Sequence, residues 1–157
     1  MHAFVSTVTM KTDAKGRVSV PKPFRAVLEA DGFEGLYCIP SPDGQSVDAG
    51  GKRLFAMFED KLAALDPTSF DYDLLATAFY GESEILTLDK EGRLALPPRL
   101  KDLADIDGHV VFVGKGHKFQ MWSPQRYQAY RAQAVQAARK VLWGGNASPA
   151  TPQDTPS

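Results

Sequence analysis

One nine-residue pattern occurs twice in the chain, and this repetition constrains the fold more than any other sequence feature. The first copy runs from Asp13 to Pro21 (DAKGRVSVP) and the second from Asp89 to Pro97 (DKEGRLALP). Asp, Gly, Arg and Pro are identical at equivalent positions, and the apolar residues keep the same alternation. An apolar run and then a helical stretch follow each copy. The sequence therefore predicts a tandem repeat of about 75 residues, in which two equivalent units pack together.

Each copy of the pattern predicts a strand, a tight turn and a second strand. Asp can hydrogen-bond the backbone just ahead of it, and Gly can take the positive φ that closes such a turn. Pro21 ends the second strand of the first copy because proline has no N–H to donate to a sheet. With Val18 and Val20 facing the core, the alternation of a strand turns Arg17 to the outside. Arg93 faces outward for the same reason, so each turn presents one guanidinium group.

The remaining sequence divides into a connector, a helix and a tail. Apolar residues recur at helical spacing in 70–79, and Ser123-Pro124 is a typical helix start. The tail contains no large apolar residue, so it cannot offset its ordering entropy. We expect repeat 1 at 5–55, a helical connector at 56–81, repeat 2 at 82–125, a C-terminal helix at 126–143 and a disordered tail at 144–157.

Composition and cysteine content indicate a soluble protein of a reducing compartment. The chain has 157 residues, of which 43% are hydrophobic and 24% charged, an ordinary globular composition. Its one cysteine, Cys38, has no partner for a disulfide or a thiol-rich zinc site. No apolar run approaches the roughly 18 residues of a membrane span, and the first residues lack the pattern of a secretory signal. These features predict a cytoplasmic protein without membrane contact.

The sequence lacks the patterns of catalytic and cofactor-binding sites. Cys38 lies in an apolar run typical of a buried strand, and neither His109 nor His117 has metal-ligand spacing or an evident nucleophile beside it. Gly114 and Gly116 do not belong to the strand–turn–helix pattern of a phosphate-binding loop. We therefore expect no enzymatic activity, no cofactor, no metal and no small-molecule ligand.

The basic residues are concentrated around the two copies of the pattern. Residues 11–25 carry a net charge of +4 and residues 88–101 a net charge of +2, whereas the whole chain carries −1. Everything else therefore carries −7, which favours nucleic-acid contact at the two patterns and repulsion elsewhere. Charged turns are also common on ordinary solvated surfaces, but the duplication and the outward arginines favour a functional role.

The paired Asp-x-x-Gly-Arg motifs resemble those of the MraZ family, bacterial regulators with two tandem SpoVT-AbrB-type repeats. Residues 78–84 (AFYGESE) and 113–122 (VGKGHKFQMW) are also similar to the family, and the similarity runs from about Phe4 to Leu142. The resemblance implies an α+β fold in which two swapped-hairpin, AbrB-like β repeats form one pseudo-symmetric β-barrel unit with flanking helices. It also implies a nucleoid-associated, ring-shaped homo-oligomer. In this family the ring binds short G-rich direct repeats in double-stranded DNA, upstream of its division and cell-wall gene cluster.

The residues and the resemblance together predict a DNA-binding surface at the two turns. Arg17 and Arg93 match the motif arginines of the family, and we expect them to contact O6 and N7 of guanine in the major groove. The neighbouring lysine and arginine side chains are expected to contact phosphates. Such contacts fix the position of the protein on the DNA and do not read its sequence. The complete predicted set is Lys11, Lys15, Arg17, Lys22, Arg25, Lys90, Arg93 and Arg99.

The sequence departs from the family pattern in two places. Residues 45–51 (QSVDAGG) replace the aromatic-ended strand and tryptophan-bearing helix start that the family leads us to expect, which affects local packing. Glu91 stands where the first copy has Lys15, so we expect the first repeat to bind DNA more strongly.

The alternative function is that of a protein-interaction module, either antitoxin-like or for assembly. Its basic turns would dock acidic helices such as residues 59–73.

Overall fold

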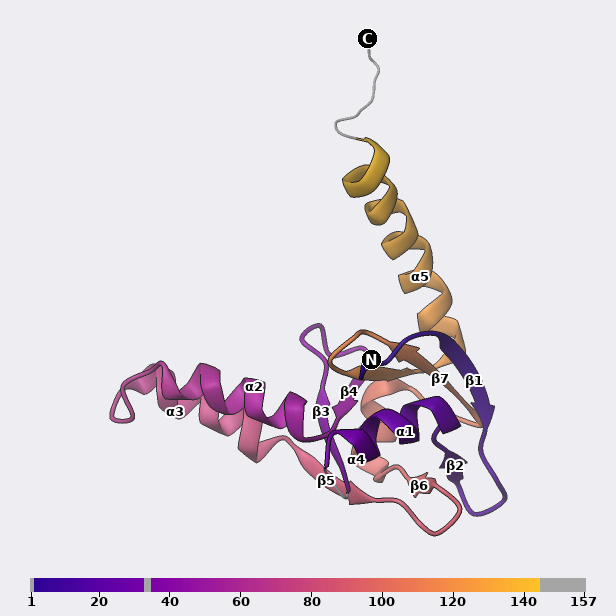
Figure 1. Cartoon of the computed structure of the whole chain (residues 1–157), viewed down its shortest axis with the longest axis horizontal. Coiled ribbons are helices and arrows are strands. Elements are labelled where there is room, and N and C mark those ends of the chain that lie inside the picture. Colours follow the sequence, from indigo (N-terminus) through magenta and orange to yellow (C-terminus); the bar gives the residue numbers. More distant parts are fainter. Residues whose placement is uncertain (1, 33–34, 145–157) are drawn as a thin grey trace. The chain divides into compact units, whose positions relative to one another are not determined.

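The structure is a computed structural model that describes residues 2–32 and 35–144. The elements of the first half are β1 (Thr7–Lys11), β2 (Arg17–Ser19), α1 (Lys22–Ala30), β3 (Gly35–Pro40), β4 (Val47–Gly50) and α2 (Lys52–Ala63). Those of the second half are α3 (Phe70–Ala76), η1 (Thr77–Gly81), β5 (Glu84–Thr87), β6 (Arg93–Ala95), α4 (Pro98–Ala104), β7 (His109–Gly114), β8 (Phe119–Trp122), α5 (Pro124–Arg139) and η2 (Lys140–Gly144). Here η denotes a π-helical turn. The order strand, strand, helix, strand, strand, helix therefore occurs twice (Figure 1).

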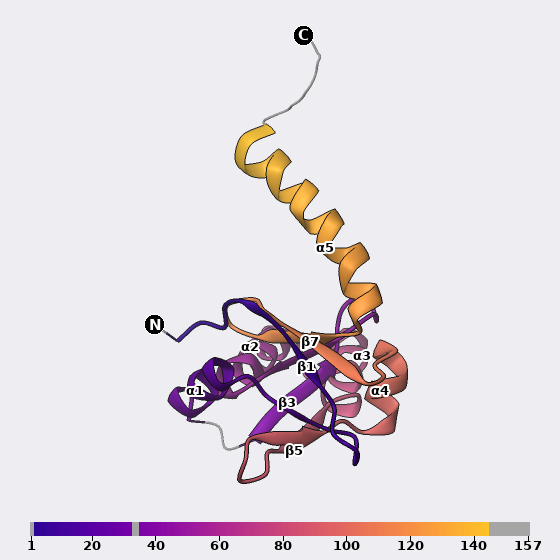
Figure 2. The ribbon, with the colours of Figure 1, turned by 90° about the vertical axis from the view of Figure 1, so that its right-hand side faces the viewer.

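The two repeats exchange their first strands. β1 pairs antiparallel with β7 of the second repeat, and β5 pairs antiparallel with β3 of the first. Figure 2 shows β1 beside β7 and β3 beside β5. The second strands, β2 and β6, pair with each other, and so do the fourth strands, β4 and β8. This pseudo-symmetric exchange confirms the expected α+β fold of two swapped-hairpin, AbrB-like repeats.

The strands form two sheets, and neither sheet closes into a barrel. The larger has the order β1-β7-β8-β4-β3-β5, and the smaller is the two-stranded ribbon β2-β6. The expected β-barrel unit is therefore open. After β1 and after β5 the chain turns away from the large sheet, and the strands that follow pair only with each other. β1 and β5 consequently remain the edges of the large sheet.

The apolar side chains of the repeated pattern lie in the core, as the alternation predicts. Val18 and its equivalent Leu94 are opposite each other in the β2–β6 ribbon, and both are buried. Beneath them, Phe24 of α1 packs against the rings of Phe112 and Phe119, with centroids 6.4 and 5.1 Å away. Burial of a side chain of this kind contributes roughly 1.5–3 kcal/mol. The ribbon that carries the two arginines is therefore anchored to a packed core.

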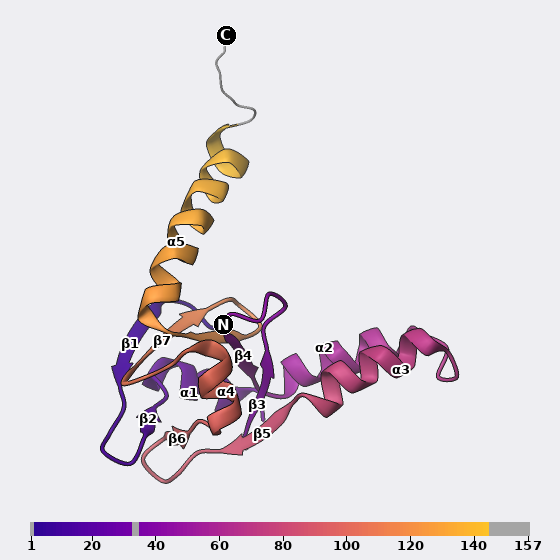
Figure 3. The ribbon, with the colours of Figure 1, turned by 180° about the vertical axis from the view of Figure 1, so that it is seen from behind.

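The helices α2, α3 and η1 form a hairpin between the repeats (Figures 1 and 3). Phe58 of α2 stacks on Phe79 of η1, with ring centroids 4.2 Å apart. The helical spacing in residues 70–79 is borne out, but Phe70, Leu74 and Leu75 are exposed. The apolar face of this hairpin is thus only partly covered.

The chain divides into two compact units, and the second begins at Gln125. It contains the rest of α5, which η2 continues to Gly144. The helix therefore begins two residues before the predicted 126 and includes the first residue of the predicted tail. Residues 145–157, where the sequence predicts disorder, lie outside the described residues.

Candidate nucleic-acid interface

The two repeated turns are built by the aspartate and the glycine of the pattern. Asp13 Oδ1 accepts hydrogen bonds from the backbone N–H groups of Lys15 and Arg17, at 2.9 and 2.8 Å. Gly16 has a φ of +77°, a conformation that glycine adopts without a Cβ penalty. In the second turn Asp89 makes both equivalent bonds at 2.9 Å. The turns therefore have one geometry because the same two residue types are required at the same places.

The same aspartates also hold the arginines. Asp13 Oδ2 accepts a hydrogen bond from Arg17 Nε at 2.8 Å, and Asp89 Oδ2 accepts one from Arg93 Nε at 2.8 Å. Within the described residues, no protein atom is bonded to either Nη group of Arg17. Each aspartate thus fixes the backbone of its turn with one oxygen and the direction of the guanidinium with the other. This second role of the aspartates is not among the sequence predictions, although the i, i+4 spacing of Asp and Arg is visible in the pattern.

The hydrogen bonds keep both carboxylates ionised. The backbone N–H of Arg17 lowers the pKa of Asp13, and the guanidinium of the same residue adds to this effect, while desolvation opposes it. The pKa of Asp89 is lowered in the same way by Arg93. The hydrogen bond from Arg93 to Asp89 in turn raises the pKa of the guanidinium. The ion pairs therefore persist at neutral pH.

Arg17 and Arg93 lie on one face of the β2–β6 ribbon. Ser19 is opposite Arg93 and Arg17 is opposite Ala95, so all four share the face away from the core. The two arginine side chains are 31% and 29% exposed. Both turns leave the same end of the fold (Figure 3). The outward orientation predicted from the alternation is correct, and the structure adds that the two groups are neighbours.

The second arginine is surrounded by more negative charge than the first. Arg93 Nη2 lies 3.6 Å from Glu91 Oε1, and its Nη1 lies 3.9 Å from Asp13 Oδ2. With Asp89, three carboxylates are therefore within 4 Å of this guanidinium. One of the two additional carboxylates is that of Glu91, which stands where the first copy has Lys15.

The other basic residues of the predicted DNA-binding set fall into two groups. Lys11, Lys15, Lys22 and Lys90 are exposed. Among the described residues, none of these four has an ion-pair partner within 4 Å. Arg25 and Arg99 are engaged instead: Arg25 Nε donates to the Val20 carbonyl at 3.1 Å, and Arg99 contacts Glu82 and Glu84 at 3.3 and 3.2 Å. Among the described residues, the four lysines are thus exposed without an ion-pair partner, whereas Arg99 has carboxylate partners in the chain.

The divergent segment 45–51 contains β4 and contributes to a buried polar network. Asp48 lies opposite Gln120 of β8, and its carboxylate accepts hydrogen bonds from Gln120 Nε2 and Lys118 Nζ, both at 2.7 Å. Trp122 Nε1 donates to Gln120 Oε1 at 2.9 Å. This network is not among the sequence predictions, because Asp48 is 70 or more residues away from its partners Lys118 and Gln120.

In the described part of the chain, neither Cys38 nor the possible metal ligands form a site. Cys38 is fully buried, and burial raises the pKa of its thiol far above the usual range. Across residues 2–32 and 35–144, no three His, Cys, Asp or Glu side chains are grouped as metal ligands. The helices described here also lack the combination of length and apolar character that a membrane crossing needs.

The interleaved repeats and their paired arginine turns define a tandem swapped-hairpin protein of the AbrB-like class. A family model described as "MraZ protein, putative antitoxin-like" matches residues 78–141. The protein named transcriptional regulator MraZ from Methylocella silvestris is 48% identical over 97% of this chain and 94% of its own length. Proteins of the same name from Xanthobacter autotrophicus and Beijerinckia indica are 49% and 44% identical, and the matches cover 90% and 99% of this chain and 90% and 95% of theirs. The chain belongs to the MraZ family, which is named for transcriptional regulation and not for an enzymatic activity.

Proposed function

We propose that the protein regulates transcription by binding G-rich direct repeats in double-stranded DNA through the β2–β6 ribbon. The observation that carries the proposal is that Arg17 and Arg93 share one exposed face, each held through Nε. A two-stranded ribbon fits the major groove, where O6 and N7 of guanine accept two hydrogen bonds from one guanidinium. Because Asp13 occupies only the Nε of Arg17, the two Nη groups remain for such a bidentate contact.

The exposed lysines supply the contacts that do not depend on sequence. Lys11, Lys15, Lys22 and Lys90 would bind phosphates and fix the position of the ribbon on the duplex. Arg25 would contribute less, because the Val20 carbonyl already accepts from its Nε. Arg99 would contribute least of the predicted set, since its charge is balanced by two carboxylates.

Assembly of several protomers would supply the DNA affinity that one protomer lacks. The chain has a net charge of −1 and offers one ribbon, so a single copy would bind weakly. A homo-oligomeric ring placed over spaced repeats raises the effective concentration of each further ribbon. In this proposal the protein is cytoplasmic and nucleoid-associated, and it acts on the division and cell-wall cluster that contains its own gene.

Binding to DNA from upstream of the gene tests the proposal. Fluorescence anisotropy of labelled fragments should show binding to fragments with the G-rich repeats, and the affinity should fall steeply with salt because counterions are released. The matched control is the same fragment with adenine in place of each repeat guanine. Equal binding to both fragments would contradict recognition of guanine by the arginines.

The second candidate function is docking of acidic protein partners. One observation favours it: both arginines already bind carboxylates, those of Asp13 and Asp89. The same DNA experiment separates the candidates, because absence of binding to any fragment at any salt concentration favours the protein-interaction module.

A further inference from the structure

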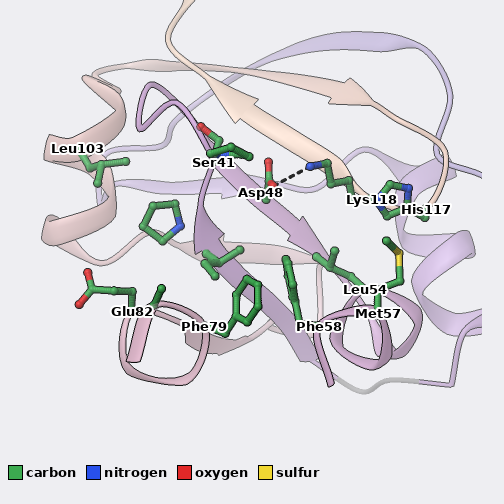
Figure 4. A pocket seen from close by; sticks show the side chains of 14 residues that line it. Ser41, Asp48, Leu54, Met57, Phe58, Phe79, Glu82, Leu103, His117 and Lys118 are labelled. Atoms are coloured by element: carbon green, nitrogen blue, oxygen red, sulfur yellow. Dashed lines mark hydrogen bonds and ion pairs between the residues drawn. The ribbon is translucent and has the colours of Figure 1, made fainter. Parts of the chain in front are cut away.

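A cavity of about 520 Å³ lies between the helical hairpin and the large sheet (Figure 4). Its walls are mainly apolar, with Met57 and Phe58 from α2, Phe79 from η1 and Leu103 from α4. On the sheet side the charge of Lys118 is balanced by the buried Asp48. A cavity with apolar walls and a neutralised ion pair is suited to apolar groups.

The hairpin that forms one side of this cavity is acidic and partly uncovered. Residues 52–82 contain six carboxylates against three basic side chains. Met57 lines the cavity and is also exposed, and Leu74 and Leu75 of α3 are exposed on the same hairpin. An exposed apolar surface with a charged surround is typical of an interaction site.

The C-terminal helix has the complementary properties. Residues 124–144 contain four basic side chains and no carboxylate. No residue of α5 or η2 is buried, and the segment ends with Val141, Leu142 and Trp143, whose exposed fractions are 82%, 65% and 79%. Large apolar side chains at the exposed end of a helix stabilise it when they pack against a further surface, because most helical stability in proteins comes from tertiary packing. The segment therefore needs a surface to pack against.

We propose that the apolar end of this helix, Val141 to Trp143, docks into the cavity of a second copy of the chain. Apolar side chains meet an apolar cavity, and a basic helix meets an acidic hairpin. This inference rests on the proposed homo-oligomer and assigns its interface. Each copy then has one donor segment and one acceptor cavity, so the contacts run head to tail, and such contacts close into a ring when the rotation between copies permits.

Two charge substitutions and a mixing experiment test the interface. Met57→Glu in the acceptor and Leu142→Glu in the donor each place a carboxylate at an exposed position, so the fold is retained. By sedimentation velocity, each variant alone should fall to the protomer mass of 17.2 kDa, because every contact needs both parts. An equimolar mixture should form a heterodimer, since one donor and one acceptor are still intact. Ala56→Glu and Ala129→Glu are the matched controls, on the same helices but outside the cavity and the apolar end, and should keep the wild-type mass.

The outcomes that overturn the interface are equally specific. They are a wild-type mass for either variant, or a mixture that stays at 17.2 kDa. A Met57→Cys/Leu142→Cys double variant adds a second readout, because the natural Cys38 is buried and cannot interfere. Oxidation should give covalent multimers on a denaturing gel. A cross-link confined to single chains would place the helix in its own cavity and would also overturn the proposal.

The design separates this inference from the proposed function. Met57→Glu leaves both arginine turns intact, so it should lose the affinity that assembly adds while the preference for guanine repeats persists. If wild-type protein binds the repeats but the variants keep their mass, the interface is wrong and the function stands. If the variants fall to protomers and wild-type protein binds no DNA, the interface stands and the function is wrong.

Discussion

The two turns share one backbone geometry and differ in the surroundings of their arginines. In both, the glycine has a φ of +77° and the aspartate accepts from two backbone N–H groups. Arg17 contacts one carboxylate, whereas Arg93 lies within 4 Å of three. Duplication has kept the parts that shape the turn and changed the electrostatics around it. A polyanion should therefore interact more strongly with the first turn than with the second.

Removal of each arginine tests this asymmetry most directly. Arg17→Ala should lower affinity for the G-rich repeats by roughly 5- to 150-fold, since a good bidentate contact discriminates by about 1–3 kcal/mol. Arg93→Ala should cost clearly less, because its guanidinium is shared with three carboxylates. Anisotropy titrations at one salt concentration measure both losses. An equal or larger loss for Arg93→Ala would contradict the ranking of the turns.

Substitution of the turn glycines should lower the free energy of unfolding by different amounts in the two turns. Gly16→Ala should lower the free energy of unfolding by about 1–2 kcal/mol, since a Cβ is strained at this φ, although nothing blocks the space around it. Gly92→Ala should cost about 1 kcal/mol more, because the added Cβ would collide with the side chain of Arg25 and break its bond to Val20. Urea unfolding measures the difference. Identical midpoints for the two variants would show that Arg25 moves aside without cost.

Glu91→Lys should make the second turn resemble the first. The change removes one carboxylate partner of Arg93 and adds a positively charged side chain. Affinity for DNA should therefore rise a few-fold, and the salt dependence of binding should steepen by about one phosphate contact. Asp102→Lys on α4 is the control, with the same change in net charge at an exposed position outside the turns and outside the helical hairpin. A similar gain for both variants would show that net charge, and not the turn, determines the effect.

Acid should destabilise both turns alike. The pKa values of Asp13 and Asp89 are lowered in the folded state, so their contribution to stability is present above their ordinary pKa and is lost as the pH falls below about 4. Asp13→Asn and Asp89→Asn should each reduce the difference in urea midpoint between pH 7 and pH 3. If either variant retains the full wild-type difference, that aspartate is not part of the acid sensitivity.

The local parts of the interface could be predicted from the sequence because their causes are local. Asp and Gly build the turn from bonds that span four residues at most, and the alternation of Val18 with its neighbours determines which way Arg17 faces. The duplication predicted a tandem repeat, and the family resemblance implied the class of fold and the hairpin exchange. The sequence did not predict that this unit is open, because the direction of the chain after β1 and after β5 depends on contacts with distant strands.

Arrangements between distant residues were decided only by the tertiary structure. The pairing of Thr7 with Val113, the approach of Arg93 to Asp13 and the contacts of Arg99 with two glutamates all join segments well separated in the chain. By itself the sequence determined the turns, the strands and their buried faces, because these depend on neighbours along the backbone. The partners of those strands, and hence the common face of the two arginines, depend on how the buried faces of both repeats pack into one core.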